Sequence, residues 1–184
     1  LVRRALSAAL DRPALVRQSS VGLAEPAHTF APAPVFGSAA GDVTLAAWAV
    51  PVAQSGWEAD RALTQARAWL AEAGYPDGAG LPPLTLLYNA SDEAAATAQA
   101  AAAMWQSGLG ITVTLQSLAW PEFSALLDGA TPLEQLPHVW RMAYCGDYPD
   151  QASWLGQFNT DQAFDRLRWA NLASAASTSD ARSF

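Results

Sequence analysis

The sequence contains no lysine, and this absence narrows the classes of partner that the protein can bind. Its 10 basic residues are all arginine, and 17 acidic residues outnumber them to give a net charge of -7 over 184 residues. A protein that binds a phosphate backbone needs clustered positive charge on one face. The charge balance therefore argues against a nucleic-acid partner.

Cysteine and long apolar runs are also scarce. Cys145 is the single cysteine, which excludes a disulfide within the chain and a zinc site built from thiolates. Although 51% of the residues are hydrophobic, no stretch approaches the roughly 20 consecutive apolar residues of a membrane-spanning helix. A chain of this length buries roughly 70% of its unfolded surface. We therefore predict one lobe with a core of its own over residues 1–184.

The pattern of apolar residues predicts a chain of alternating helices and strands. Strands are predicted over residues 84–88 and 111–118, and the long helix between them makes them parallel neighbours. The predicted helices are residues 2–10, a second one after Asp11 and Pro13, one from Asp60 to Gly74, an alanine-rich one from Ser91 or Asp92 to Gly108, one opened by Trp120, and a last one from Asp161.

A long irregular loop is predicted over residues 22–56, where prolines and glycines interrupt every periodicity. It contains a short candidate strand over residues 43–50 and also His28, which we interpret as a solvated histidine. A loop of this length usually wraps a surface or serves a site. The polar residues 174–183 are expected to form a frayed end.

The segment from His138 to Phe158 is the best candidate for a functional site. Its apolar run over residues 139–145 predicts a strand, which breaks at Gly146 and carries Asp147 just beyond its carboxyl end. Ligand-binding side chains in α/β proteins usually lie at that end of the strands, because the loops diverge there while the sheet fixes the position where each loop begins. We therefore predict that Asp147 contacts a ligand.

Aromatic and basic residues surround Asp147 in the sequence. Tyr144, Tyr148 and Trp154 are placed to shield its carboxylate from water, and a desolvated carboxylate among aromatic rings suits a cationic partner such as an ammonium group. Arg141 is a candidate for binding a ligand carboxylate through its bidentate guanidinium. An equally good interpretation of Arg141 is a salt bridge to a neighbouring acid, which includes Asp147 itself.

Asp147 also has a purely structural interpretation. A short helix is predicted over residues 151–157, and either Asp147 or Asp150 has the residue type that begins such a helix as its N-cap. The local sequence does not decide between a capping and a ligand-binding role.

Several segments resemble one known family, the extracytoplasmic solute-binding proteins of family 5, which are the oligopeptide- and dipeptide-binding components of ABC importers. The resemblance spans roughly residues 1–170 and is carried by short motifs in the same order. These are Val2 to Arg12, Leu70 to Gly78 (Leu-Ala-Glu-Ala-Gly-Tyr-Pro-Asp-Gly), Leu109 to Val113, Trp120 and the stretch from Arg141 through Asp147-Tyr148-Pro149-Asp150.

The resemblance implies a fold, a function and a set of site residues. The fold would be α/β, a mixed sheet with flanking helices, forming most of the C-terminal lobe of a two-lobed periplasmic-binding-protein-like (type II) receptor, and the chain would be an excised part of that receptor. In this family the aspartate that matches Asp147 takes the α-amino group of a bound peptide, and the tryptophan that matches Trp120 lines the cavity, although a tryptophan packed on the core would look the same. The predicted ligand-binding residues are Asp147, Tyr144, Arg141, Trp120, Cys145 and Tyr148.

The resemblance also implies partners. These are a peptide or similar small solute and a membrane-bound ABC permease, at an extracytoplasmic location with or without a lipid anchor. We predict no cofactor, no metal and no enzymatic activity. Because family 5 also contains binders of nickel, haem and sugars, the ligand class stays open at this stage.

Two other functions are compatible with a chain of this composition. A hydrolase could use Asp147 and Asp150 as paired carboxylates, but a turn containing proline gives no reliable opposed geometry, and His138 lies too far from Cys145 along the chain to form a nucleophile-base pair. A protein-interaction module without a small ligand could use the eight tryptophans as an interface.

Overall fold

The computed structural model describes residues 1–19, 24–27, 31–32, 35, 57–127 and 131–155. The predicted strand at 43–50, the helix from Asp161, the polar end 174–183 and His28 lie outside the described residues, as does most of the loop predicted over 22–56. The chain divides into two compact units, of which the first holds residues 1–28, 42–119 and 137–142 and the second holds the rest. The prediction of one lobe over residues 1–184 stays a prediction.

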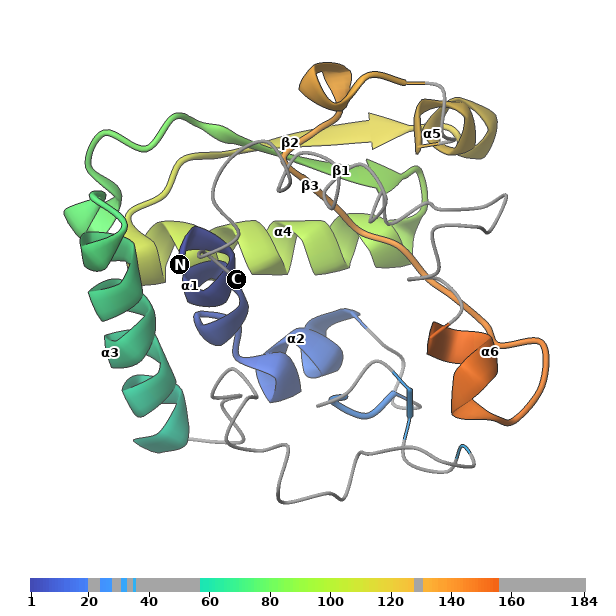
Figure 1. The fold of residues 1–184 in the computed structure, drawn as a ribbon, viewed down its shortest axis with the longest axis horizontal. Helices are drawn as coiled ribbons and strands as arrows, with labels where there is room; N and C mark the ends of the chain where they lie inside the picture. The colour runs from blue at the N-terminus through green and yellow to red at the C-terminus, as the bar shows by residue number, and fades with distance from the viewer. Residues whose placement is uncertain (20–23, 28–30, 33–34, 36–56, 128–130, 156–184) are drawn as a thin grey trace. The chain divides into compact units, whose positions relative to one another are not determined.

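A parallel three-stranded sheet forms the centre of the first unit (Figure 1). Its strands are β1 (Leu84–Asn89), β2 (Val113–Leu118) and β3 (Val139–Trp140), in the order β2-β1-β3. In the registers, Leu84 pairs with Val113 and Leu86 pairs with Val139. The predicted parallel pairing is confirmed, and so is the α/β class. The sheet that we expected to be mixed is parallel throughout the strands that the structure describes.

Strand β3 is shorter than the apolar run that predicted it. The strand was expected over residues 139–145, but it ends at Trp140, and the N–H of Arg141 donates the adjoining hydrogen bond, to the carbonyl of Leu87 at 2.8 Å. Ala143 and Cys145 are exposed, and Met142 and Tyr144 on the alternate positions are only half-buried, so neither side of the run beyond Arg141 is buried. Hydrophobicity alone does not tell whether a segment finds a strand partner.

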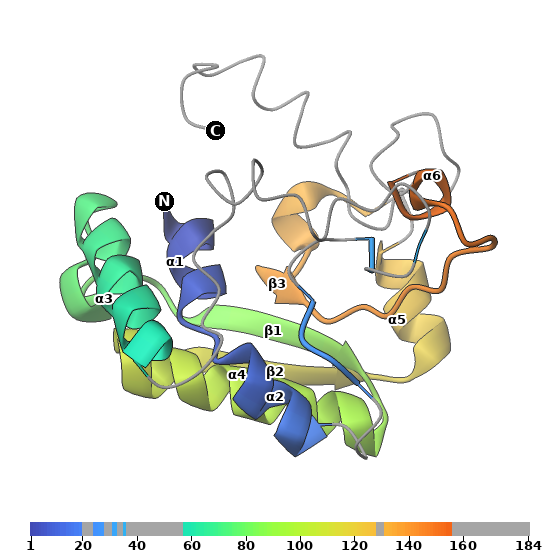
Figure 2. The same cartoon turned by 90° about the horizontal axis from the view of Figure 1, so that it is seen from below.

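Helix α4 (Asp92–Leu109) connects β1 to β2 and lies along the sheet (Figures 1 and 2). Of the two predicted N-cap residues, Ser91 and Asp92, Ser91 is the cap, because its Oγ accepts a hydrogen bond from the N–H of Ala94 at 3.2 Å. The predicted end at Gly108 is wrong by two residues: Gly110, at φ 68°, terminates the helix. Gly108 is buried in the last turn instead, where a Cβ would lie 2.8 Å from Cδ1 of Leu63 on the neighbouring helix.

The remaining helices of this unit are α1 (Val2–Ala8), α2 (Arg12–Ser19) and α3 (Trp57–Glu72). Helix α3 begins before the predicted cap Asp60, which therefore lies inside it, whereas its predicted end at Gly74 is confirmed by a left-handed φ of 92° there. Helices α2 and α3 contact α4, and α1 contacts α3. The core that they share includes Ala5, Leu6, Ala8, Ala66, Leu70, Leu84, Leu86, Ala98, Ala101, Trp105, Leu109 and Ile111.

A buried hydrogen bond joins α1 to α4. The indole N–H of Trp105 donates to the carbonyl of Leu6 at 2.8 Å, across 99 residues of sequence. We expect Trp105→Phe to lower the free energy of unfolding by about 1–3 kcal/mol, because the carbonyl is left without its donor in the core. Urea denaturation of the full-length protein measures this loss. Trp140→Phe is the control, since Trp140 is half-buried and makes no such bond among the described residues; equal losses would contradict the prediction.

Two glycines bring the end of α3 and the end of α4 together. The short 3-10 turn η2 (Pro76–Gly78) follows α3, and a Cβ at Gly78 would lie 2.7 Å from the carbonyl oxygen of Gly110. A Cβ at Gly110 would in turn collide with the carbonyl oxygen of Asp77. The two backbones therefore touch at a distance that only glycine permits.

The second unit contains α5 (Trp120–Leu127), the 3-10 turn η3 (Leu133–Gln135) and α6 (Gln151–Leu155). The helix predicted to open at Trp120 is confirmed, and its apolar residues Phe123 and Leu127 are fully buried. None of the helices in the described part of the chain has the length and the apolar character that a membrane span requires.

Candidate functional site

Asp147 lies in a turn of the second unit that leads from residue 143 to α6. Its backbone N–H donates to Oγ of Ser153 at 2.8 Å, while its side chain is exposed. Among the residues that the structure describes, the Asp147 carboxylate makes no hydrogen bond and no ion pair. The turn thus holds the backbone of Asp147 and leaves its charge open to solvent.

Asp150, and not Asp147, caps the short helix α6. Its Oδ1 accepts a hydrogen bond from the N–H of Ala152 at 2.8 Å, and its carbonyl accepts one from the N–H of Ser153 at 3.1 Å. This is the interaction that an aspartate makes at the start of a helix. Of the two predicted cap residues, the structure therefore assigns the capping role to Asp150.

The aromatic residues near Asp147 pack on each other rather than around its carboxylate. Tyr144 and Trp154 meet edge to face, with ring centroids 5.4 Å apart at 84°, and the Tyr144 hydroxyl donates to the carbonyl of Ser153 at 2.9 Å. Tyr148 is 53% exposed. The predicted shielding of Asp147 from water is therefore not formed within the described residues, because two of the three rings are engaged with α6.

Gly146 permits this packing. A Cβ at Gly146 would lie 2.6 Å from Nε1 of Trp154, so the indole occupies the space that a side chain would need. The group that approaches the Gly146 backbone this closely is therefore Trp154 of the same chain.

We expect Gly146→Ala to disturb this packing and lower the free energy of unfolding by about 1–3 kcal/mol, which is the usual cost of overfilling a packed site. The near-ultraviolet circular dichroism of the full-length protein should change with it, since Trp154 must move. Adding Trp154→Phe removes Nε1, the atom that would lie nearest the new Cβ, and the double variant should be less destabilised than the sum of the two single variants. Strict additivity would show that the contact does not limit this turn.

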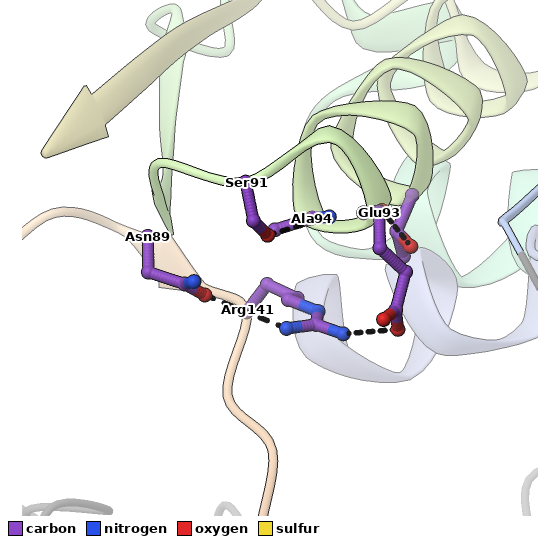
Figure 3. A network of polar contacts seen from close by, with 6 residues as sticks. Asn89, Ser91, Glu93, Ala94 and Arg141 are labelled. Atoms are coloured by element: carbon purple, nitrogen blue, oxygen red, sulfur yellow. Dashed lines mark hydrogen bonds and ion pairs between the residues drawn. The ribbon is translucent and has the colours of Figure 1, made fainter. Parts of the chain in front are cut away.

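Arg141 belongs to a polar network in the first unit (Figure 3). Its Nη2 forms an ion pair with Oε1 of Glu93 at 2.9 Å, and its Nη1 donates to Oδ1 of Asn89 at 3.4 Å. Arg141 thus bridges the carboxyl end of β1 and the first turn of α4. The salt-bridge interpretation of Arg141 is confirmed with Glu93 as the acid, and not Asp147. Because the Glu93 side chain is 65% exposed, the pair contributes little to stability.

Trp120 and Cys145 are both accessible to solvent. Trp120, the first residue of α5, is 52% exposed, and its ring stacks on Phe123 with centroids 5.7 Å apart at 24°. Trp120 therefore packs on the buried Phe123 with one part of its ring and leaves the rest open to solvent. Cys145 is an exposed free thiol. Whether these two residues contact a ligand stays a prediction.

The structure assigns roles to two residues, Ser153 and His138, for which the sequence predicted none. Ser153 holds the Asp147 backbone, and Nδ1 of His138 accepts a hydrogen bond from the N–H of Thr85 at 2.9 Å, where β3 begins beside β1. A serine soon after a predicted cap is a usable signal, because hydroxyls often bond to nearby backbone. The His138 contact spans 53 residues of sequence, and no local pattern predicts it. No cluster of metal-ligating side chains occurs in the part of the chain that the structure describes.

Comparison with known proteins gives consistent matches. The model of the family described as bacterial extracellular solute-binding proteins, family 5 Middle, matches residues 1–165. The chain is 32% identical over 174 residues to the periplasmic oligopeptide-binding protein OppA of Salmonella typhimurium, covering 94% of this chain and 29% of that protein. It is 31% identical over 173 residues to the periplasmic murein peptide-binding protein MppA of Escherichia coli, again covering 94% of this chain and 29% of that protein.

Solved structures agree with these matches. The structure of the E. coli murein tripeptide binding protein MppA aligns with a TM-score of 0.72 and 25% identity, over 97% of this chain and 33% of that chain. The fold also matches Haemophilus influenzae OppA in complex with RPPGFSPFR, with a TM-score of 0.70 at 20% identity, over 100% of this chain and 34% of that one. The chain thus spans about a third of the length of these relatives.

Proposed function

Since this chain belongs to the bacterial extracellular solute-binding proteins of family 5, we propose that it forms one ligand-contacting part of a receptor that captures peptides outside the cytoplasm for an ABC permease. Two kinds of support exist. The relatives are named as oligopeptide-binding and murein peptide-binding proteins. The chain itself supplies an anchored, exposed carboxylate, the group that a cationic ligand end requires.

The observation that carries the proposal is the state of Asp147. Its backbone is tied to a buried hydroxyl at 2.8 Å, while the carboxylate is exposed and unpaired among the described residues. A peptide brings a protonated α-amino group, which donates charge-assisted hydrogen bonds to a carboxylate. We therefore propose that the Asp147 carboxylate binds the amino terminus of the peptide. A carboxylate exposed in this way needs a second surface to bury the ligand, so we expect tight binding only in the full-length receptor.

The other predicted residues receive roles as part of the same proposal. Tyr144, Cys145 and Tyr148 flank Asp147 in the turn, and Trp120 presents an exposed ring from the same unit. We propose that they line the space for ligand side chains. Arg141 is the candidate for a ligand carboxylate, which would have to share the guanidinium with Glu93 or displace it.

We propose no catalytic role for this chain. A paired-carboxylate hydrolase would need both Asp147 and Asp150, but one oxygen of Asp150 is engaged in capping α6. Capping leaves Asp150 oriented toward its own helix rather than toward a bond to be cleaved.

Native mass spectrometry of the full-length protein, purified gently, tests the proposed function. We expect the protein to release peptides on denaturation, and these peptides should have free amino termini. Release of a metal chelate or a sugar, together with no binding of added peptides, would contradict the proposal while leaving the family membership intact.

A further inference from the structure

Ser153 is the one buried polar residue that the described part of the chain contains, at 7% exposure. A buried polar group is informative because it is retained only where it has hydrogen-bond partners. Ser153 has three within the second unit. Its Oγ accepts from the N–H of Asp147 at 2.8 Å, its carbonyl accepts from the hydroxyl of Tyr144 at 2.9 Å, and its N–H donates to the carbonyl of Asp150 at 3.1 Å.

We propose that Ser153 is a positioning residue that fixes the Asp147 carboxylate for the amino terminus of the ligand. The inference rests on the proposed function, because it deepens the role given to Asp147. In this inference Ser153 does not touch the ligand itself. It acts through the backbone of Asp147, which does.

The geometry explains why the carboxylate needs this support. The Asp147 side chain has no partner among the described residues, so the contacts that they provide restrain the position of the carboxylate through its backbone. One side of the turn is held by Tyr144 and Trp154, which meet edge to face, and Gly146 lies against the indole. The hydroxyl of Ser153 holds Asp147 itself. Without it, the turn must be ordered at the moment of binding, and that ordering weakens affinity.

Alanine at position 153 removes the acceptor and little else. Ser153 is buried, so water cannot readily replace the lost hydroxyl, and the N–H of Asp147 is left without its partner. The main-chain bonds of residue 153 to Tyr144 and Asp150 do not involve the side chain and should persist. The variant therefore isolates the contact to Asp147.

The test measures peptide affinity by calorimetry on the full-length receptor, with the same peptide carrying either a free or an acetylated amino terminus. We expect Ser153→Ala to weaken binding of the free peptide about tenfold, as the loss of one well-placed hydrogen bond does. Binding of the acetylated peptide should not change. In an Asp147→Asn background, Ser153→Ala should cause no further loss for the free peptide, because the charge that it positions is gone.

Two control variants separate positioning from general stability. Ser91→Ala removes a serine hydroxyl that caps α4 and should lower stability by a similar amount, but it should leave the preference for a free amino terminus unchanged. Ser153→Thr keeps an acceptor at the same place and should retain most of the preference. If Ser153→Ala does not fold, the threonine variant and the hydrogen-exchange protection of the Asp147 amide in the unaltered receptor decide the question.

The outcomes distinguish the two proposals. If Asp147→Asn binds the free peptide as well as the unaltered receptor does, the proposed function of Asp147 is wrong. Suppose that Asp147→Asn binds the free peptide weakly. If Ser153→Ala then keeps its affinity for the free peptide, or loses affinity for the free and the acetylated peptide by the same factor, the role of Ser153 is wrong and that of Asp147 stands. An unprotected Asp147 amide would also overturn the inference.

Discussion

Asp147→Asn in the full-length receptor is expected to weaken the binding of free-amino peptides by about 30-fold to several thousand-fold, which corresponds to about 2–5 kcal/mol. Asparagine has the shape of aspartate but lacks its charge, so the fold of the turn is retained and only the attraction for an ammonium group is removed. The backbone bond from residue 147 to Ser153 Oγ is unaffected, which makes the substitution specific. Calorimetric titration with a peptide of defined sequence measures the change.

Asp150→Asn is the matched control for this experiment. It makes the same chemical change three residues along the chain, at a residue whose oxygen caps α6. Asparagine caps a helix about as well as aspartate does, so stability and peptide affinity should both be retained. Unchanged affinity in Asp147→Asn, or an equal loss in both variants, would contradict the assignment of Asp147.

Gly110→Ala is expected to lower the free energy of unfolding by more than about 3 kcal/mol, and to prevent folding if the stability of the protein is marginal. Two costs add. Residue 110 has φ 68°, which is unfavourable for any residue with a side chain, and its Cβ would collide with the carbonyl oxygen of Asp77. A backbone atom cannot move aside as a flexible side chain does, so η2 must separate from the end of α4. Denaturant unfolding of the full-length protein, with the yield of folded protein, measures the effect.

Gly80→Ala separates the two costs. Gly80 has a comparable φ of 80°, but no atom lies within 4 Å of the position that its Cβ would take. The loss there should be limited to backbone strain, about 1–2 kcal/mol. If Gly80→Ala destabilises the protein as much as Gly110→Ala does, the collision with the Asp77 carbonyl adds nothing to the loss of stability in Gly110→Ala.

The features predicted correctly from the sequence are those that arise within one element or between close neighbours. Ser91, one of the two predicted cap residues, caps α4; Gly74 follows the end of α3 with a left-handed φ; and β1 and β2 are parallel because a long helix joins them. Each depends on interactions a few residues apart, such as a serine oxygen that accepts from the N–H three positions on. Local patterns report such interactions directly.

The site separates into a part that the sequence predicted and a part that it did not. The choice of the segment around Asp147 as the candidate site followed from a break in an apolar run at Gly146 and from the resemblance of its residues to a family motif. The partners of its residues did not follow. The capping role could belong to either aspartate, and only the structure shows that Asp150 bonds to Ala152 while Asp147 bonds through its backbone to Ser153.

By itself, the sequence determined the α/β class, the order of the helices and strands and the segment that carries the candidate site. Tertiary structure alone decided that Arg141 pairs with Glu93 across 48 residues and that β3 ends at Trp140. The physical reason is that such contacts depend on strand register and on how the helices pack on the sheet. Strand register brings together residues that are far apart in the sequence, and no local pattern indicates that they are neighbours.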